Sequence, residues 1–323
     1  MEDLSLSVLD ERFQDPIAAA TYLESIRWPN GPVCPHCGES ERRPYPLKSK
    51  TRKLYKCAAC RKQYTVTVGT IFEGSHIPLN KWLLAFNLLC ASKKGMSAHQ
   101  LHRMLGVTYK TAWFMFHRIR YAMEQPPFQR RLEGVVEADE TYIGGKVRRP
   151  NRKQYAPLKG TEPDPRKRKS GRGTDKTPVV SLVERGGEVR SFRVANVTGD
   201  SLKGAIRTHV DPRARIMTDA FQSYQGLADE FASHETVNHL SEYVRGDVHT
   251  NTAENYFSIL KRGIDGVYHH VSEAHLPRYL AEFGLPLQHP HQGRLHGRAA
   301  DAASPVDGRR QATPVRGLGT RFA

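Results

Sequence analysis

The sequence contains few cysteines, no long apolar stretch and a deficit of acidic residues. Only five of its 323 residues are cysteine, and four of these form two CxxC pairs. The longest largely apolar stretch, residues 82–90, contains one asparagine and falls far short of the roughly 18 residues that a membrane-spanning helix needs. The opening residues MEDLSLSVLDE lack the basic and apolar regions of a signal peptide. We therefore expect a cytoplasmic, nucleoid-associated protein with reduced thiols and no membrane partner.

Basic residues outnumber acidic ones by 49 to 33, which gives a formal net charge of +16. An excess of this size indicates a polyanionic partner, and nucleic acid is the first expectation. More than half of the excess lies in residues 146–176, where twelve Lys and Arg residues accompany three acidic ones. Because this stretch has no apolar period, we predict a disordered basic insertion whose charge can still neutralise phosphates.

The N-terminal part predicts a docking helix followed by a zinc ribbon. Within residues 1–28, Asp15 and Pro16 form a favourable helix start. Within residues 29–76, nineteen residues separate the two CxxC pairs, and a strand is predicted through Tyr64, Val66 and Val68. Four thiolates complete the closed tetrahedral shell of one structural Zn²⁺ ion, whereas buried cysteines without metal would not explain two CxxC pairs in polar surroundings. The predicted ligands are Cys34, Cys37, Cys57 and Cys60.

Residues 77–127 predict a helix-turn-helix. One amphipathic helix over 79–94, with Cys90 in its apolar core, precedes a second helix. A tight turn at Gly106 and Val107 then leads into a third helix that begins near Thr108. A three-helix bundle without DNA contacts is the alternative, but the many basic side chains of the region favour phosphate contacts. The predicted DNA-binding residues are Tyr109, Lys110, Thr111 and Arg118.

After Glu133 the apolar pattern changes from helical to strand-like. Strands are predicted at 134–145 and on both sides of a turn at 185–187, followed by a helix at 200–210. A strand that runs into a helix at 214–224, a short strand at 234–240 and a helix at 250–264 complete the pattern. The order predicts an α/β catalytic domain at residues 128–283 with one mixed sheet, of the ribonuclease H-like, integrase type.

Three carboxylates fall at the ends of these elements. Asp139 leaves the first strand, Asp219 leaves the fourth, and Glu254 lies at the head of the last large helix. In a ribonuclease H-like sheet the first and fourth strands are neighbours, so these acids would gather at one edge. Two Mg²⁺ or Mn²⁺ ions could then bridge them and support in-line attack at phosphorus. Lys261 and Arg262, two turns beyond Glu254, could hold the DNA backbone nearby, or could simply form a solvated helix end.

Each acid also has a simpler explanation. Asp219 could cap a helix that follows it, and Glu254 could belong to a capping arrangement with Asn251. Asp139 and Glu140 could be turn residues. Glu137 and Glu140 are weaker metal-binding candidates, since only one acid near position 139 needs to face the ions. The coincidence of three acids at equivalent ends of the fold favours the catalytic interpretation.

The chain resembles a known family, the bacterial insertion-sequence DDE transposases with an N-terminal zinc ribbon and an ISXO2-like transposase domain. The resemblance runs from about Ala18 to Phe283 and includes VGTIFEGSHIPLNKWLLAF, VEADETYIGGK, IMTDAF and VHTNTAENYFSILKRGI. It implies a catalytic triad of Asp139, Asp219 and Glu254, the last two being 35 positions apart. It further implies binding to the element's terminal inverted repeats and to target DNA, strand cleavage and transfer, and a homodimer or higher oligomer. His249 and Asn251 belong to the motif before the glutamate, where we expect them to position Glu254.

The resemblance stops after Phe283. Residues 284–323 have no period and no family-like ending, so we expect them to be disordered. The residues GLPLQHPHQG can be encoded by codons that, after loss of one leading G, read DFRYNTRTK, a family-like continuation. This points to a frameshift, with a divergent tail as the alternative. Pro277, predicted to lie inside the last helix, would also strain it.

Two other classes remain open. A catalytically inactive or domesticated DNA-binding protein would keep the ribbon and the helix-turn-helix, with the acidic fold as a relic. A nuclease of the same fold would cut DNA without joining it. The three intact acids argue against a long-decayed relic.

Overall fold

The computed structural model describes residues 15–124, 130–144, 174, 176–238, 242 and 244–284. Contacts divide the described residues into two compact units, one built from residues 15–88 and 101–124 and the other from residues 89–100 and those described between 130 and 284. Nearly all of the predicted basic insertion, and the tail beyond Gly284, lie outside the described residues. Within the described ranges, no helix has the length and apolar character to span a bilayer.

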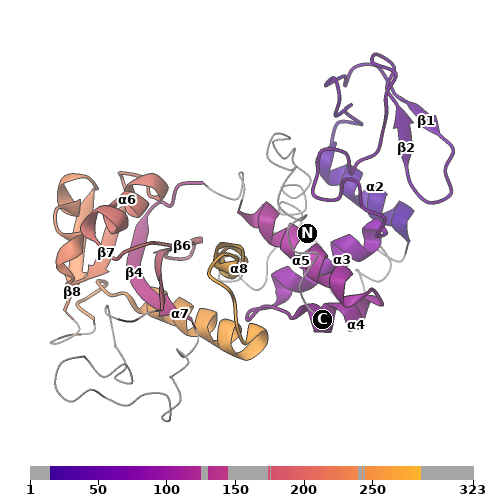
Figure 1. Ribbon diagram of the computed structural model, residues 1–323. Coiled ribbons are helices and arrows are strands. Elements are labelled where there is room, and N and C mark those ends of the chain that lie inside the picture. Colours follow the sequence, from indigo (N-terminus) through magenta and orange to yellow (C-terminus); the bar gives the residue numbers. More distant parts are fainter. Residues whose placement is uncertain are drawn as a thin grey trace, which may run out of the picture. The chain divides into compact units, whose positions relative to one another are not determined.

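The first unit begins with a capped helix and a small antiparallel sheet (Figure 1). In α2 (Pro16–Arg27) the Asp15 carboxylate accepts hydrogen bonds from the backbone N–H groups of Ile17 and Ala18, as the sequence predicts. The sheet contains β1 (Tyr45–Leu47), β2 (Leu54–Lys56) and β3 (Gln63–Tyr64) in this order.

The strand predicted through Val68 is wrong beyond Tyr64, where β3 ends. The carbonyl oxygens of Val66 and Val68 accept hydrogen bonds from the Arg27 guanidinium, at 2.6 and 2.8 Å. The chain therefore turns back towards α2 and does not extend the sheet.

Three helices complete this part of the chain: α3 (Leu79–Ala91), α4 (Ala98–Leu105) and α5 (Tyr109–Met123). The turn between α4 and α5 includes Gly106, whose φ of +58° favours glycine. The Thr108 hydroxyl accepts a hydrogen bond from the backbone N–H of Thr111 and so caps α5, close to the predicted helix start. The helix predicted to reach residue 94 ends at Ala91.

The second unit is built on a five-stranded mixed sheet. Its strands are β4 (Val135–Ile143), β5 (Thr177–Glu184), β6 (Val189–Arg193), β7 (Arg215–Asp219) and β8 (Ser233–Val237). They lie in the order β6-β5-β4-β7-β8, with β4, β7 and β8 parallel and with β5 antiparallel to both of its neighbours. The first and fourth strands of the domain are therefore adjacent, which confirms the predicted α/β, ribonuclease H-like arrangement.

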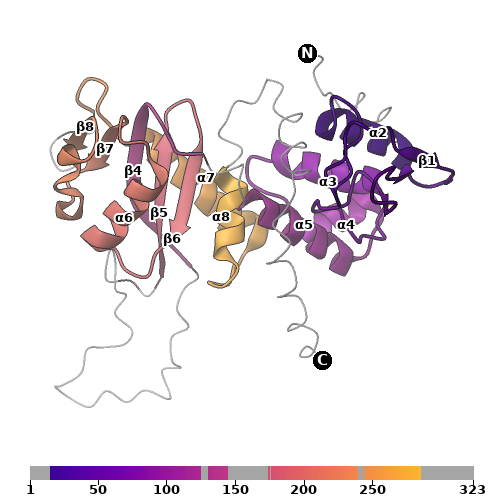
Figure 2. The same ribbon diagram turned by 90° about the horizontal axis from the view of Figure 1, so that it is seen from above.

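Helices cover both faces of this sheet (Figure 2). α6 (Gly199–His209) packs on the face to which Val136 and Ala138 point. α7 (Asn251–Gly263), the π-helical turn η4 (Ile264–Tyr268) and α8 (Leu276–Gly284) cover the other face, where Ile143 is buried. Since side chains of a strand alternate between faces, the odd-numbered residues of β4 point towards α7.

Two sequence predictions for this unit are wrong. No α-helix follows Asp219, because two short 3-10 turns, η2 (Gln222–Tyr224) and η3 (Leu227–Asp229), are separated by Gly226 with a φ of +86°. Pro277 does not strain α8, because the helix begins at Leu276 and a proline in the first turn removes no intrahelical hydrogen bond.

Candidate metal and nucleic-acid sites

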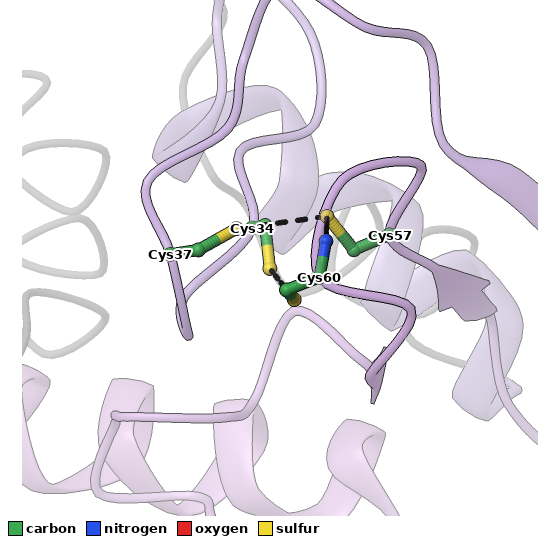
Figure 3. A group of neighbouring side chains, drawn as sticks. All are labelled: Cys34, Cys37, Cys57 and Cys60. Atoms are coloured by element: carbon green, nitrogen blue, oxygen red, sulfur yellow. Dashed lines mark hydrogen bonds between the residues drawn. The ribbon is translucent and has the colours of Figure 1, made fainter.

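The four cysteines of the two CxxC pairs converge on one point (Figure 3). Their Sγ atoms all lie within 4.8 Å of one another. The Sγ atoms of Cys34 and Cys60 are 3.7 Å apart, and those of Cys37 and Cys57 are also 3.7 Å apart. Sulfurs bound tetrahedrally at roughly 2.3 Å from Zn²⁺ would be about 3.8 Å from one another, so the cluster fits the ion.

Two equivalent turns create this cluster. The backbone N–H of Cys34 donates to the Glu39 carbonyl and that of Cys57 to the Lys62 carbonyl, each at 2.9 Å. The residue after each second cysteine, Gly38 or Arg61, adopts a positive φ of 77° or 61°. The repeated turn aims both thiols of each pair inward.

The cluster also favours a thiolate. Burial opposes ionisation of Cys57, but the backbone N–H groups of Cys60 and Ala59, with the neighbouring thiols, lower its pKa to about 7. The Cys60 N–H lies 3.4 Å from the Cys57 sulfur. A metal ion therefore finds one ligand already close to its ionised form at neutral pH.

The predicted catalytic acids of the sheet lie where the pairing of β4 with β7 ends. These parallel strands pair in register up to Ala138 and Thr218, so Asp139 and Asp219 follow one step later on adjacent strands. Both are odd-numbered and point to the face of α7, the face on which Met217 packs with Val135. The Asp219 carboxylate accepts the Phe221 N–H at 3.1 Å, within the loop and not at a helix start.

Burial and neighbouring negative charges both disfavour ionisation of Asp139. Burial raises the pKa of Asp139 to about 7, against the opposing hydrogen bond from the Glu140 N–H at 2.7 Å. The neighbouring negative charges that raise it further belong to Glu140, Asp219 and Glu254. Asp219 and Glu254 thus lie near enough to Asp139 for their charges to act on it, although in the described residues only the four cysteines converge as a metal-binding cluster.

Glu254 lies in the first turn of α7 and is exposed. Its backbone N–H bonds to the Thr250 carbonyl at 3.0 Å, and Asn251 is the first helical residue. The proposed capping arrangement of Asn251 with Glu254 does not form, since Asn251 lies inside the helix and the N-cap position belongs to Thr250. His249 faces Arg185, whose Nη2 lies 2.9 Å from its Nδ1.

The two neighbouring acids of β4 have other partners. Glu140 points to the α6 face and accepts a hydrogen bond from the buried Tyr224 hydroxyl at 3.0 Å. Glu137 is fully buried and bonds to Arg185 and to the start of α7. Arg185 and Tyr224 were missed as functional candidates, because the pattern of the sequence gave only a hairpin turn and a helix at their positions.

Of the predicted DNA-binding residues of α5, two are exposed at its start and two contact other residues of the protein. Tyr109 and Lys110 are exposed at the start of the helix. Thr111 bonds to the capping residue Thr108. The half-buried Arg118 donates to the Glu73 carbonyl at 2.8 Å and lies over the ring of Trp82, so the structure directs its guanidinium into its own unit.

Lys261 and Arg262 lie in the last turn of α7, and both are exposed. The Lys261 ammonium lies 6.0 Å from the centre of the Phe257 ring, and Arg262 donates to the Ser258 hydroxyl at 2.5 Å. They are on the helix that carries Glu254, about two turns further along.

Two segments of the chain match known protein families. Residues 131–284 match the ISXO2-like transposase domain, and residues 17–63 match the transposase zinc-ribbon domain. A relative from Halobacterium salinarum, described as an uncharacterized protein in transposable element ISH50, is 33% identical over 278 residues. That alignment covers 83% of this chain and 89% of the relative.

Solved structures show only distant likeness. A chain of the simian T-cell lymphotropic virus intasome in complex with PP2A regulatory subunit B56 gamma is 17% identical, with a TM-score of 0.29, and the match covers 61% of this chain and 66% of that one. A pre-cleavage Mos1 transpososome is 12% identical, with a TM-score of 0.25, and the match covers 68% and 76%. Similarities at these TM-scores carry no argument about function.

Proposed function

The chain belongs to the family of transposases that combine an ISXO2-like transposase domain with a transposase zinc ribbon, and we propose that it binds the terminal inverted repeats of its own insertion sequence and there cleaves and transfers DNA strands. The observation that carries this proposal is the electrostatic group at the β4–β7 edge. Asp139 lies beside Asp219 on the face of α7 and is subject to the charge of Glu254.

The proposed catalytic residues are Asp139, Asp219 and Glu254. They would hold two Mg²⁺ or Mn²⁺ ions, which supply activation of the attacking hydroxyl or water and stabilisation of the leaving oxygen. The chain's own part is to present three carboxylates from two adjacent strands and one helix. Because the strands are internal to a hydrogen-bonded sheet, the separation of Asp139 and Asp219 is fixed before any DNA arrives.

The proposed DNA contacts lie in both units. Tyr109, Lys110 and Thr111 form the start of α5, where a recognition helix meets a groove, and the first two of them are exposed. Arg118 would support that helix from behind through Glu73 and Trp82. Lys261 and Arg262 would bind backbone phosphates near the scissile bond. His249 and Asn251 would help to set the start of the helix that carries Glu254.

The zinc ribbon would hold one structural Zn²⁺ ion through its four cysteines and act in binding the element's ends. The ion would stabilise a fold whose three short strands offer little core. A homodimer or higher oligomer on cytoplasmic, nucleoid DNA would bring two ends together.

The test is cleavage and joining of DNA that carries the element's own ends, with Mg²⁺ or Mn²⁺ and without metal. We expect metal-dependent nicking at the ends and transfer of the cut strand to a target. Binding to the ends without cleavage would support the inactive or domesticated DNA-binding protein, and cleavage without joining would support a nuclease. End binding should weaken steeply as salt rises, because phosphate contacts release counterions.

A further inference from the structure

We infer that Glu137 is a positioning residue, which fixes the start of α7 and thereby the place of Glu254 relative to Asp139. The inference rests on the proposed function, because it assigns Glu137 its role through Glu254. Glu137 is one of the two acids, with Glu140, that the sequence leaves as weaker metal-binding candidates. Its contacts direct it to the backbone of the helix.

The Glu137 carboxylate is fully buried and both of its oxygens are engaged. Oε2 accepts the backbone N–H groups of Thr252 and Ala253, at 2.8 and 3.0 Å. Oε1 accepts the Thr252 hydroxyl at 2.9 Å and the Nε–H of Arg185 at 2.6 Å. A carboxylate with these partners has little capacity left for a metal ion.

α7 depends on this carboxylate because it has no side-chain cap of its own. Its N-cap residue, Thr250, makes no capping hydrogen bond. The first N–H groups of a helix need acceptors, and the positive end of the helix dipole favours a negative charge. Glu137 provides both from a strand that lies more than a hundred residues earlier in the chain.

Arg185, in the turn between β5 and β6, also bonds to Glu137 and to the segment that leads into α7. Besides the bond to Glu137, its Nη1 donates to the Asp247 carbonyl at 2.7 Å and its Nη2 to the His249 carbonyl at 3.0 Å. Nη2 also lies 2.9 Å from His249 Nδ1, which is itself 3.2 Å from Oε1 of Glu137. Arg185 therefore neutralises the buried carboxylate and fixes the segment that leads into α7.

The geometric consequence concerns the acids of the proposed site. Glu137 and Asp139 are two positions apart on β4 and point to the same face. Glu254 directly follows Ala253, whose N–H bonds to Glu137. One strand segment thus holds Asp139 directly and holds Glu254 through two hydrogen bonds, which sets the distance between them independently of the loops that connect them.

The test compares Glu137→Gln with Glu282→Gln in the full-length chain. Glu282 is a matched control, since it is also a buried glutamate of this unit and its carboxylate accepts a hydrogen bond from the Tyr268 hydroxyl of η4. We expect Glu137→Gln to raise the Mg²⁺ concentration needed for half-maximal cleavage roughly 10–100-fold, because residues that orient metal ligands have effects of this size. Mn²⁺ should restore part of the activity, and end binding should be unchanged. Glu282→Gln should leave the Mg²⁺ dependence unchanged.

A second variant pair and a second readout make the result decisive. Arg185→Lys should retain more activity than Arg185→Ala, since lysine keeps the charge that accompanies Glu137. In Glu137→Gln, backbone amides of residues 250–254 should exchange with deuterium faster than in the Glu282→Gln control. An unchanged Mg²⁺ dependence with unchanged exchange in Glu137→Gln would overturn the inference. Complete loss of activity in both metals with unchanged exchange would make Glu137 a metal ligand and would also overturn it.

Failure of the proposed function has a different signature. In that case the unaltered chain and the Glu282→Gln control show no metal-dependent cleavage. Calorimetric Mn²⁺ titration and amide exchange then decide the positioning role by themselves. Weaker Mn²⁺ binding and faster exchange in Glu137→Gln support that role, and unchanged values reject it.

Discussion

Asp139 lies in the middle of β4 and Asp219 is the last residue of β7, and each directly follows a residue at which these neighbouring parallel strands are paired in register. Their carboxylates point to the same face of the sheet, where α7 brings the charge of Glu254. The charge repulsion among them gives the site properties that can be measured with and without metal.

Loss of any one acid should abolish chemistry and spare binding. We predict that Asp139→Asn, Asp219→Asn and Glu254→Gln each eliminate metal-dependent cleavage, since each removes a charged oxygen donor. End binding, measured by fluorescence anisotropy, should stay near the unaltered value because none of these residues lies in the helix-turn-helix. A variant that cleaves at the normal rate would remove its residue from the proposed triad.

The raised pKa of Asp139 predicts that, in the metal-free protein, this residue contributes more to the free energy of unfolding at acidic pH than at mildly basic pH. The folded state holds the Asp139 proton up to about pH 7, whereas the ordinary value is 3.8. The stabilising contribution is therefore complete below about pH 4 and is lost as the pH rises through about 7. A pKa change of one corresponds to about 1.4 kcal/mol, so the cost at pH 8 is on the order of a few kcal/mol.

The corresponding experiment is thermal unfolding of Asp139→Asn at pH 5 and pH 8 without divalent metal. We expect this variant to be more stable than the unaltered chain at pH 8, with a smaller difference at pH 5. Mg²⁺ should stabilise the unaltered chain more at pH 8 than at pH 5. The exposed Glu133→Gln serves as the control. A destabilised Asp139→Asn at pH 8 would show that burial and the neighbouring charges do not disfavour the ionised carboxylate.

Zinc should be confined to the ribbon. Replacing Cys57 by serine removes one of four converging thiols, so we predict loss of zinc, unfolding of the ribbon and weaker end binding. The second unit should unfold at its usual temperature. Elemental analysis and calorimetry measure these effects, with Cys90→Ala as the control that keeps its zinc. A native protein without zinc would contradict the prediction.

Gly95 should tolerate substitution less well than another glycine of the same backbone conformation. It has a φ of +81°, and an added Cβ would lie 2.1 Å from the Tyr268 hydroxyl, which itself bonds to the Met96 N–H and to Glu282. Gly226 has a φ of +86° with open space around it. We expect Gly226→Ala to cost about 1–2 kcal/mol from the left-handed backbone alone.

Gly95→Ala should cost about 1–3 kcal/mol more, because the tyrosine must move. Denaturant unfolding measures both variants. Adding Tyr268→Phe, which removes the hydroxyl, should recover part of the extra loss in Gly95→Ala. Equal costs for Gly95→Ala and Gly226→Ala would show that residues 92–97 do not pack closely on Tyr268.

The described residues end at Gly284, so the prediction for the tail rests on the sequence alone. The match to the transposase domain also ends at residue 284. We predict that truncation after Phe283 is no less stable or active than the full chain, and that a DFRYNTRTK continuation is better than both. The restored frame replaces Gly284, where an added Cβ would lie 2.8 Å from the Val189 carbonyl, so the last turn of α8 must shift slightly. A truncation that destroys folding would show that the tail is part of the fold.

The sequence by itself determined those features that depend on short-range spacing. Two CxxC pairs define zinc ligands because each turn places its own thiols, whatever the rest of the chain does. Asp15 and Pro16 define the start of α2 in the same local way. The order of elements matched the ribonuclease H-like fold, and that match predicted that the strands of Asp139 and Asp219 are neighbours.

Only the tertiary structure decided the roles of groups whose partners are remote in the chain. Glu137 looked like a possible metal ligand, but the N–H groups that it accepts belong to residues 115 and 116 positions later. The carbonyls of Val66 and Val68, which a continuing strand would have paired, are taken by Arg27, and the turn at Gly226 replaces a predicted helix. The apolar period of a sequence predicts which face of an element is buried. It does not predict which groups from distant parts of the chain are buried beside that face, and hydrogen bonds and charge pairs depend on those groups.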